Sequence, residues 1–255
     1  MKKYTVKIIS SIVLATMITA CQDLDRPELG DYPVDTGNYT PKSGEKLYAS
    51  FENKYYLNSV SGAPALKVGT PGLGIPKFGN YSFSGAENSY ISYPLKELYS
   101  SAGISFAFWY KINASPDRAG IITINDNDND SDENRKQGLR IFREGSNTKQ
   151  RIKLNLGVGN DESWNDGGEV DVDGNWVYIT VTISPTSSKI YFNGILQNTS
   201  TYASPFDFST SNTMVLGSGA PSFIYWNHKS DLSLIDDLRV FNKELSQTEI
   251  QNLMQ

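Results

Sequence analysis

The chain has 255 residues, a net charge of −5 and a pI near 5.0, with one cysteine and one histidine. No basic run or basic face stands out, which argues against nucleic acid as a partner and against electrostatic binding to anionic lipid headgroups. A single cysteine also excludes an intramolecular disulfide, so core packing must stabilise the folded part.

The first twenty residues are interpreted as a signal peptide. Three lysines in MKKYTVK precede the apolar run IISSIVLATMITA, which is too short to span a membrane. The run ends at ITAC, which resembles the lipobox of bacterial lipoproteins. That resemblance implies cleavage before Cys21, lipidation of Cys21 and an outer-membrane lipoprotein, attached only through its lipid and displayed at the cell surface. The alternative is an ordinary secretory signal with a stray cysteine.

Residues 21–45 are expected to comprise the lipidated cysteine and a flexible tether. The segment is polar, acidic and rich in Pro and Gly, a composition that cannot bury enough apolar surface to fold. Acids directly after the cysteine resemble the surface-export signal of Bacteroidota lipoproteins, and DRPELGDYP resembles surface lipoproteins of that phylum.

Residues 46–255 show the pattern of an all-β domain. ISFAFWYKI (104–112) and WVYITVTI (176–183) alternate with period two, and KIYFNGILQ (189–197) places an Asn-Gly turn between two strands. Near the end, LSQTEIQNLM predicts one helix, with Ser246 as N-cap and Glu249 completing a capping box. The pattern predicts a two-sheet antiparallel sandwich with one short C-terminal helix.

Three stretches together resemble one family. ISFAFWYK, GNWVYITVTISPTSSKIYFNGIL and LIDDLRVFNKELSQTEIQNL occur in the order found in the LamG-like jelly-roll domains of the concanavalin A-like lectin and glucanase superfamily. The resemblance runs from about Leu47 to Leu253 and implies two curved antiparallel sheets. Its members include lectins, glycosidases, polysaccharide lyases and adhesion domains, so the residues must decide the function.

Catalytic residues are not assigned. EVDVDG (169–174) resembles the acidic strand of family 16 glucanases, whose alternate carboxylates cleave glycosidic bonds. Here, however, the strand WVYITVTI follows almost at once, so the acids are expected to lie on a solvated edge. His228 is the single histidine. The sequence contains no serine elbow for a catalytic triad that would use it, and the several His or Cys ligands of a zinc site are missing.

Glycan binding is the function that the sequence favours. Sugars bind through stacking aromatic rings and through planar polar groups that bond hydroxyls. Two tryptophans occur in polar, loop-like segments, which predicts a ligand site formed by Trp164, Asn165, Asp166, Tyr225, Trp226, Asn227 and His228. The partner would be an extracellular polysaccharide or oligosaccharide, captured for neighbouring surface uptake proteins. The alternatives are that both rings cap the ends of the sandwich, that the chain is a glycan-cleaving hydrolase or lyase, or that it is an adhesive subunit with a protein partner.

One structural calcium is also predicted. In LIDDLRVF, alternation places Asp236 on one face with Leu234, Leu238 and Val240, where a carboxylate needs a partner. The segment resembles a calcium-binding strand of related glucanases, which implies that Asp236 is a ligand, with Glu52 as a companion. The alternative is that Asp236 binds backbone amides or an arginine.

The segment NDNDNDSDEN (125–134) resembles the start of an EF-hand loop but lacks the glycine at position six, the glutamate at position twelve and the flanking helices. We expect a solvated loop between two strands, GIITI before it and GLRIFR after it.

Overall fold

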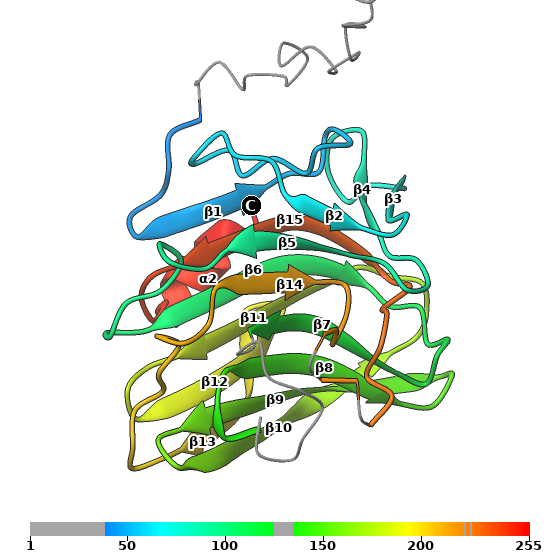
Figure 1. Cartoon of the computed structure of the whole chain (residues 1–255). Helices are drawn as coiled ribbons and strands as arrows, with labels where there is room; N and C mark the ends of the chain where they lie inside the picture. The colour runs from blue at the N-terminus through cyan, green and yellow to red at the C-terminus, as the bar shows by residue number, and fades with distance from the viewer. Residues whose placement is uncertain (1–38, 125–134, 222, 225) are drawn as a thin grey trace, which may run out of the picture. The chain divides into compact units, whose positions relative to one another are not determined.

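The computed structural model describes residues 39–124, 135–221, 223–224 and 226–255. These residues form two packed antiparallel sheets (Figure 1). We call them the helix-covered sheet, in which the strand order is β13-β12-β11-β6-β15-β4-β3 with β1 also paired to β15, and the open sheet, ordered β10-β9-β8-β7-β14-β5-β2.

The strands of the helix-covered sheet come from both ends and from the middle of the domain. They are β1 (Glu45–Ala49), β3 (Gly72–Gly74), β4 (Ser82–Ser84), β6 (Ile104–Lys111), β11 (Val177–Ile183), β12 (Ser187–Phe192), β13 (Ile195–Thr201) and β15 (Leu234–Phe241). Strand β6 pairs with β11 on one side and with β15 on the other, so segments far apart in the sequence form the centre of the sheet.

The strands of the open sheet include the two longest of the described chain. They are β2 (Leu66–Val68), β5 (Tyr90–Pro94), β7 (Arg118–Ile124), β8 (Leu139–Gly145), β9 (Lys149–Val158), β10 (Asp161–Asp171) and β14 (Thr213–Leu216). Strand β10 is the last strand at one edge of this sheet. The two strands predicted on either side of residues 125–134 are confirmed as β7 and β8, while residues 125–134 themselves lie outside the described part.

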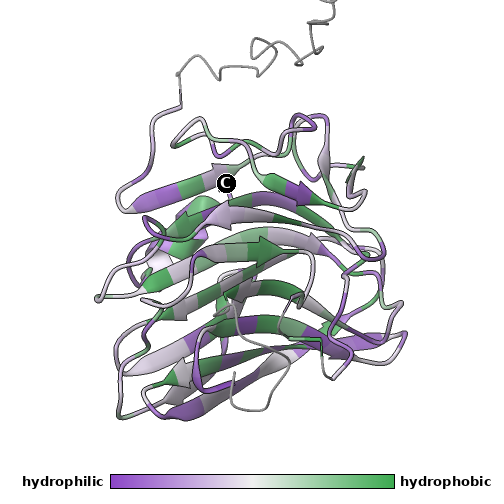
Figure 2. Ribbon diagram, in the orientation of Figure 1, coloured by the Kyte–Doolittle hydropathy of each residue, from purple (hydrophilic) through white to green (hydrophobic). Residues whose placement is uncertain are grey.

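The main core lies between the sheets, and the period-two alternation determines which side chains enter it. Ile104, Phe106, Phe108 and Tyr110 of β6 all belong to the main core. The intervening Ala107 and Trp109 face the other side, where helix α2 (Gln247–Leu253) packs with Ile250 and Leu253. Apolar and polar positions alternate along the strands in the same way in Figure 2. One face of the helix-covered sheet is therefore closed by the C-terminal helix.

The sequence correctly predicted two local features that depend only on neighbouring residues, a hairpin turn and a helix cap. Asn193 and Gly194 adopt left-handed φ angles of 49° and 73° between β12 and β13, which is the turn that an Asn-Gly pair favours. Ser246 caps α2, and its side chain and that of Glu249 form the reciprocal bonds of a capping box. The helix is the one α-helix in the described part of the chain.

The face predicted for Asp236 is wrong because β15 contains a bulge. Asp237 has a left-handed φ of 53°, and the pairing with β6 shifts register between Asp236 and Arg239. Asp236 pairs with Trp109 and so faces away from the main core, whereas Leu238 lies within it. One extra residue in the strand thus moves this carboxylate to the opposite face.

The N-terminal part of the domain begins ahead of the boundary predicted at residue 45. The ring of Tyr39 stacks on Tyr48 at 4.6 Å, and the hydroxyl of Tyr39 accepts a hydrogen bond from Arg239. Cys21 and the predicted signal peptide lie outside the described residues. No helix in the described part is long and apolar enough to cross a membrane.

Candidate functional site

The open sheet presents one polar and aromatic face away from the core. On β9, alternate side chains enter the main core at Ile152 and Leu154, which leaves Lys153 and Asn155 on the other face. On β10, Trp164 pairs with Asn155 and is 38% exposed. Trp164 therefore lies within a strand and not in the loop that its polar neighbours suggested.

A pocket on this face brings together residues from five separate parts of the chain. It has a volume of about 150 Å³ and is lined by Arg118, Arg135, Phe142, Glu144, Lys153, Trp164, Phe223, Trp226 and His228. We call it the central pocket. Trp164, Trp226 and His228, which the sequence placed in one site, line it together.

Aromatic rings form the wall of the central pocket. Phe142 of β8 contacts Trp164 edge-on at 6.1 Å and His228 at 4.5 Å. Phe223 stacks on His228 at 4.8 Å and contacts Trp226 at 5.7 Å. Phe142, Phe223 and His228 are buried in this cluster, so Trp164 and Trp226 are the rings that it leaves accessible to a ligand. Phe142 and Phe223 were not among the residues predicted from the sequence, although Phe142 alternates with core residues in LRIFRE and that pattern could have indicated it.

A loop between β14 and β15 carries Phe223, Trp226 and His228, and backbone hydrogen bonds hold several of its described residues. The amide of Gly120 donates to Lys229 O at 3.1 Å, and that of Phe223 donates to Gly219 O at 2.7 Å. Gly219 is tightly enclosed: a Cβ there would lie 2.0 Å from His228 O, which leaves room only for glycine. The loop thus has a defined position against β7.

Buried charge anchors the end of the same loop. Arg143 Nε and Nη2 donate to Asp231 Oδ1 at 3.2 and 3.1 Å, and Tyr110 donates to Asp231 Oδ2 at 2.5 Å. Tyr110 belongs to the helix-covered sheet and Arg143 to the open sheet. Asp231 therefore connects both sheets to the segment that follows His228.

His228 is an unusual part of the pocket because it is almost fully buried. Neither ring nitrogen has a hydrogen-bond partner within the described chain, although Nε2 lies 3.4 Å from Glu144 Oε2. Burial lowers the pKa of His228 to about 4, and the nearby charge of Glu144 offsets this only in part. The imidazole is therefore neutral at neutral pH.

Lys153 forms ion pairs with two acids of the site, Glu144 and Asp166. Its Nζ lies 3.1 Å from Glu144 Oε1 and 3.0 Å from Asp166 Oδ1. Burial opposes the charge of Glu144, but the hydrogen bond and charge of Lys153 outweigh it and hold the pKa of Glu144 below its usual value. Glu144 is therefore ionised at neutral pH and unsuited to act as a general acid.

The remaining residues predicted for the ligand site have different positions. Asn165 is buried and donates to Ser188 O at 3.0 Å, because alternation turns it away from Trp164 toward the other sheet. The structure therefore does not bring Asn165 to the pocket. Asp166 forms an ion pair with Lys153, which lines the pocket. Asn227 lies between Trp226 and His228 in the sequence, is exposed, and has a left-handed φ of 62°. Tyr225 lies outside the described residues.

The acids that resemble a glucanase strand lie away from the central pocket. Glu169 and Asp171 are exposed near the end of β10, and Arg151 Nη2 lies 2.9 Å from Glu169 Oε1. Asp173 accepts hydrogen bonds from the backbone and side chain of Asn175 in the following turn. This arrangement agrees with the expected solvated edge.

The two carboxylates predicted to bind calcium both accept hydrogen bonds from backbone amides of residues 77–80. Asp236 Oδ2 accepts from the amides of Lys77 and Phe78 at 2.7 and 3.0 Å, and Glu52 Oε2 accepts from the amide of Asn80 at 2.9 Å. Amide donors direct positive charge at the oxygens that a cation would use, so this arrangement favours the alternative that Asp236 binds backbone amides. Among the residues described, no group of three or more His, Cys, Asp or Glu could hold a metal ion.

The fold is that of a jelly-roll sandwich of the concanavalin A-like class. The family model for the concanavalin A-like lectin/glucanases superfamily (Laminin_G_3) matches residues 84–251, and the chain belongs to this family. No curated protein is detectably similar to it in sequence.

Solved structures show the same fold at low sequence identity. Domain 4 of AbnA, a GH43 extracellular arabinanase from Geobacillus stearothermophilus in complex with arabinotriose, has a TM-score of 0.59 and 16% identity, with 83% of this chain and 98% of that one covered. The binding domain of botulinum neurotoxin DC in complex with SialylT has a TM-score of 0.54 and 19% identity, with 82% of this chain covered. The binding domain of serotype G has a TM-score of 0.57, 20% identity and 81% coverage. The match spans only 50% of each neurotoxin domain.

Proposed function

We propose that the protein binds extracellular carbohydrate, without cleaving it, through the central pocket on the open sheet. The observation that carries this proposal is the meeting of Trp164 and Trp226, which are remote in sequence, in one pocket with charged hydrogen-bonding groups. Aromatic rings beside ionic donors and acceptors are what a sugar ring with its hydroxyls requires. Carbohydrate ligands in two proteins of the same fold are consistent with it.

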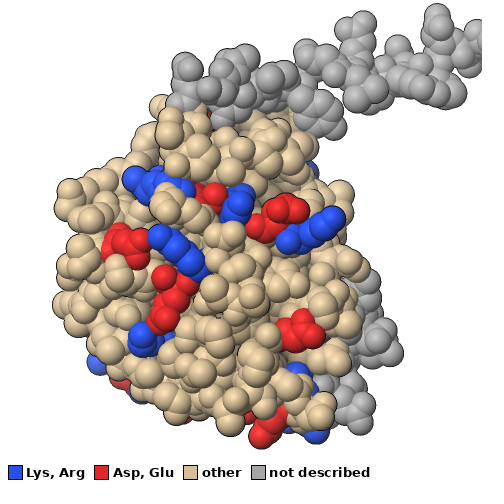
Figure 3. Space-filling model, turned by 90° about the vertical axis from the view of Figure 1, so that its left-hand side faces the viewer, with Lys and Arg blue, Asp and Glu red and all other residues tan. Residues whose placement is uncertain are grey.

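The charges around the pocket suit an uncharged glycan. Lys153 contacts two acids, Arg135 lies 3.5 Å from Glu162, and Arg118 lies 3.6 Å from Asp117. Every one of these cations therefore has an acidic neighbour. The face shown in Figure 3 carries scattered acidic and basic side chains among mostly uncharged ones, with no large area of one sign. Paired ions offer donors and acceptors to hydroxyls without attracting a polyanion.

A non-catalytic role is supported by the state of the acids. Glu144 and Asp166 share Lys153, and the pKa of Glu144 is lowered, whereas glycoside hydrolysis needs a carboxyl with a raised pKa beside a second carboxylate. His228 is neutral, but it is enclosed by Phe142 and Phe223. These features favour binding over cleavage.

The cellular setting that we propose comes from the N-terminal sequence. The signal peptide and the ITAC motif predict an exported lipoprotein with its lipid on Cys21, carried at the surface of a bacterium of the Bacteroidota type. There it would capture polysaccharide for neighbouring uptake proteins. Cys21→Ser in the full chain should shift the protein from the membrane fraction to the soluble fraction, whereas an unchanged distribution would contradict lipidation.

The experiment that tests the function is a binding screen of residues 22–255 against arabinan, xylan, mannan, β-glucan and polygalacturonate. Retention by one of them, with no shortening of the bound glycan on chromatography, supports the proposal. Shortened products would instead indicate a glycan-cleaving enzyme. If the folded protein binds none, the proposal fails, and a protein partner becomes the leading alternative. The search would then start from the exposed apolar side chains Leu66, Val68, Ile75, Phe78 and Tyr81.

A further inference from the structure

We propose that the ligand is an extended oligosaccharide chain that occupies three adjoining pockets along β9 and β10, and not a single terminal sugar. This inference rests on the proposed function. The central pocket of about 150 Å³ is smaller than typical ligand sites of about 300–1,000 Å³, so an oligosaccharide anchored there would extend beyond it.

One extension leads toward the turn between β8 and β9. Arg118 and Glu144 line the central pocket and also a second, wider pocket of about 760 Å³. The second pocket continues over Gly145, Ser146, Lys149, Arg151 and Glu169. Its charged groups are exposed and paired, as Lys149 and Arg151 both contact Glu169. It thus continues the paired-ion surface of the central pocket.

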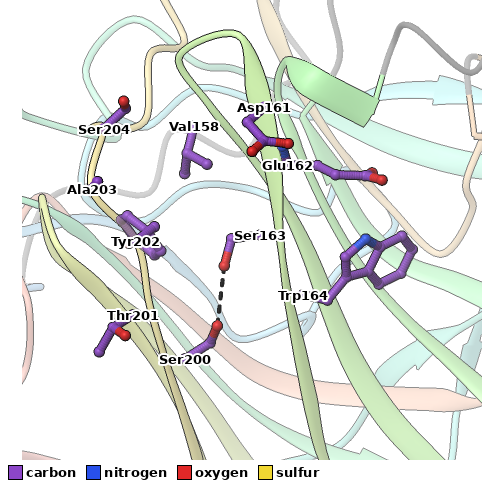
Figure 4. A pocket seen from close by; sticks show the side chains of 10 residues that line it. All are labelled: Val158, Asp161, Glu162, Ser163, Trp164, Ser200, Thr201, Tyr202, Ala203 and Ser204. Carbon is purple, nitrogen blue, oxygen red and sulfur yellow. Dashed lines mark hydrogen bonds between the residues drawn. The ribbon is translucent and has the colours of Figure 1, made fainter.

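The other extension lies at the free edge of β10. Trp164 lines the central pocket and also a third pocket of about 350 Å³, which we call the edge groove (Figure 4). Besides Trp164, the edge groove is lined by Val158, Asp161, Glu162, Ser163, Ser200, Thr201, Tyr202, Ala203 and Ser204. Figure 4 shows Trp164 and Glu162 on the opposite side of β10 from Ser163, so the edge groove lies around the edge of this strand from the central pocket, and Trp164 is the residue that lines both.

The edge groove is suited to hydroxyl groups. Ser163 Oγ and Ser200 Oγ lie 3.1 Å apart, and Tyr202 donates to Ser184 O at 2.7 Å, which fixes its ring. Small hydroxyl side chains can each donate and accept, as sugar hydroxyls do. The groove has a mostly polar lining, in which Glu162 pairs with Arg135 at 3.5 Å, and this suits further sugar units better than an apolar ligand.

The second and central pockets lie along the outer face of β9 and β10, and the edge groove lies around the edge of β10 from them. Strand β9 has ten residues, which at about 3.3 Å per residue corresponds to roughly 30 Å. The second pocket includes Lys149 at the start of β9 and the central pocket Lys153 in its middle, both on the outer face, whereas the edge groove includes Val158, whose side chain points to the core side. One sugar chain would occupy all three pockets by passing over Trp164 at the edge of β10, the residue that the central pocket and the edge groove share.

Chain length is the variable that tests the inference. Oligosaccharides of increasing length, prepared from the polysaccharide retained in the screen, are titrated against residues 22–255 by calorimetry. We expect affinity to rise by about tenfold or more from the dimer to the hexamer, which corresponds to about 1.4 kcal/mol or more. Equal affinity for all lengths would overturn the extended track while leaving carbohydrate binding intact. No binding at any length would overturn both proposals.

A variant that fills the edge groove tests whether this third pocket belongs to the binding site. Ala203 is exposed and small in the edge groove, so Ala203→Trp should fill the groove and lower the affinity for the hexamer by about tenfold, with little change for the dimer. Ala102→Trp, an equally exposed alanine that lines none of the three pockets, is the control. Thermal unfolding of both variants checks that they fold. Wild-type affinity of folded Ala203→Trp for the hexamer would remove the edge groove from the site.

Discussion

Arg143 and Asp231 form a buried ion pair, with Nη2 of Arg143 3.1 Å from Oδ1 of Asp231 and both side chains at most 1% exposed. The pair connects β8 to the segment that follows Trp226 and His228. Ser233 adds a hydroxyl donor to Asp231 at 2.7 Å, and Tyr110 adds another. The position of the β14–β15 loop therefore depends on this buried polar network.

Asp231→Asn should destabilise the domain by about 3–5 kcal/mol, because it leaves the buried guanidinium of Arg143 without its counter-charge. The measurement is the free energy of unfolding in urea. Asp171→Asn is the matched control, since Asp171 forms an exposed pair with Lys149 at 3.5 Å and its loss should have little effect. Equal stability of the two variants would mean that the buried network does not hold the loop.

Trp164→Ala and Trp226→Ala should each weaken glycan binding by about tenfold or more without unfolding the domain, since both rings line the central pocket. Affinity is measured by titration with the glycan identified in the screen. Tyr81→Ala is the control, as Tyr81 is 46% exposed and lines none of the three pockets. Wild-type affinity of both tryptophan variants would exclude the central pocket as the binding site.

His228 should make the domain less stable in acid. Its pKa is about 4 in the folded state and about 6.5 when unfolded, so between these pH values the unfolded chain binds more protons. Stability should fall as the pH drops from about 6.5 to 4, by roughly 3 kcal/mol from this group alone.

His228→Phe removes the titration and keeps the ring between Phe142 and Phe223. The free energy of unfolding is therefore compared between the wild type and this variant at each pH. Burial raises the pKa of Asp236 to about 6 and gives the opposite slope, but both proteins contain Asp236, so the difference isolates His228. A difference that does not change with pH would show that His228 is not buried as a neutral ring.

A chelator should leave thermal unfolding unchanged, because backbone amides of residues 77–80 already bond the carboxylates of Asp236 and Glu52. The measurement is the Tm with EDTA and with added calcium. Calcium at Glu52 and Asp236 remains a prediction of the sequence, and a Tm that falls in EDTA and recovers with calcium would establish it.

Binding of an uncharged glycan should change little with salt, because the cations of the central pocket already have acidic neighbours. Affinity is compared at low and at physiological ionic strength, where screening of exposed charges differs strongly. A marked loss of affinity with salt, or retention of polygalacturonate alone, would instead indicate an acidic glycan.

The sequence by itself determined the features that depend on local patterns. Alternation in ISFAFWYK placed Phe106 and Phe108 in the core, the Asn193-Gly194 pair specified a hairpin, and Ser246 with Glu249 specified the start of the helix. Each of these requires only neighbouring residues and the period of a strand or a helix. The family motifs then joined these elements into a jelly-roll.

Only the tertiary structure decided which side chains share a surface. The bulge at Asp237 reversed the face of Asp236, strand pairing placed Trp164 in β10 beside Lys153, and the β14–β15 loop brought Trp226 to the same pocket. Phe142 and Phe223 joined them from other segments. These positions depend on register and on contacts between distant segments, where a shift of one residue moves a side chain to the other face of a sheet.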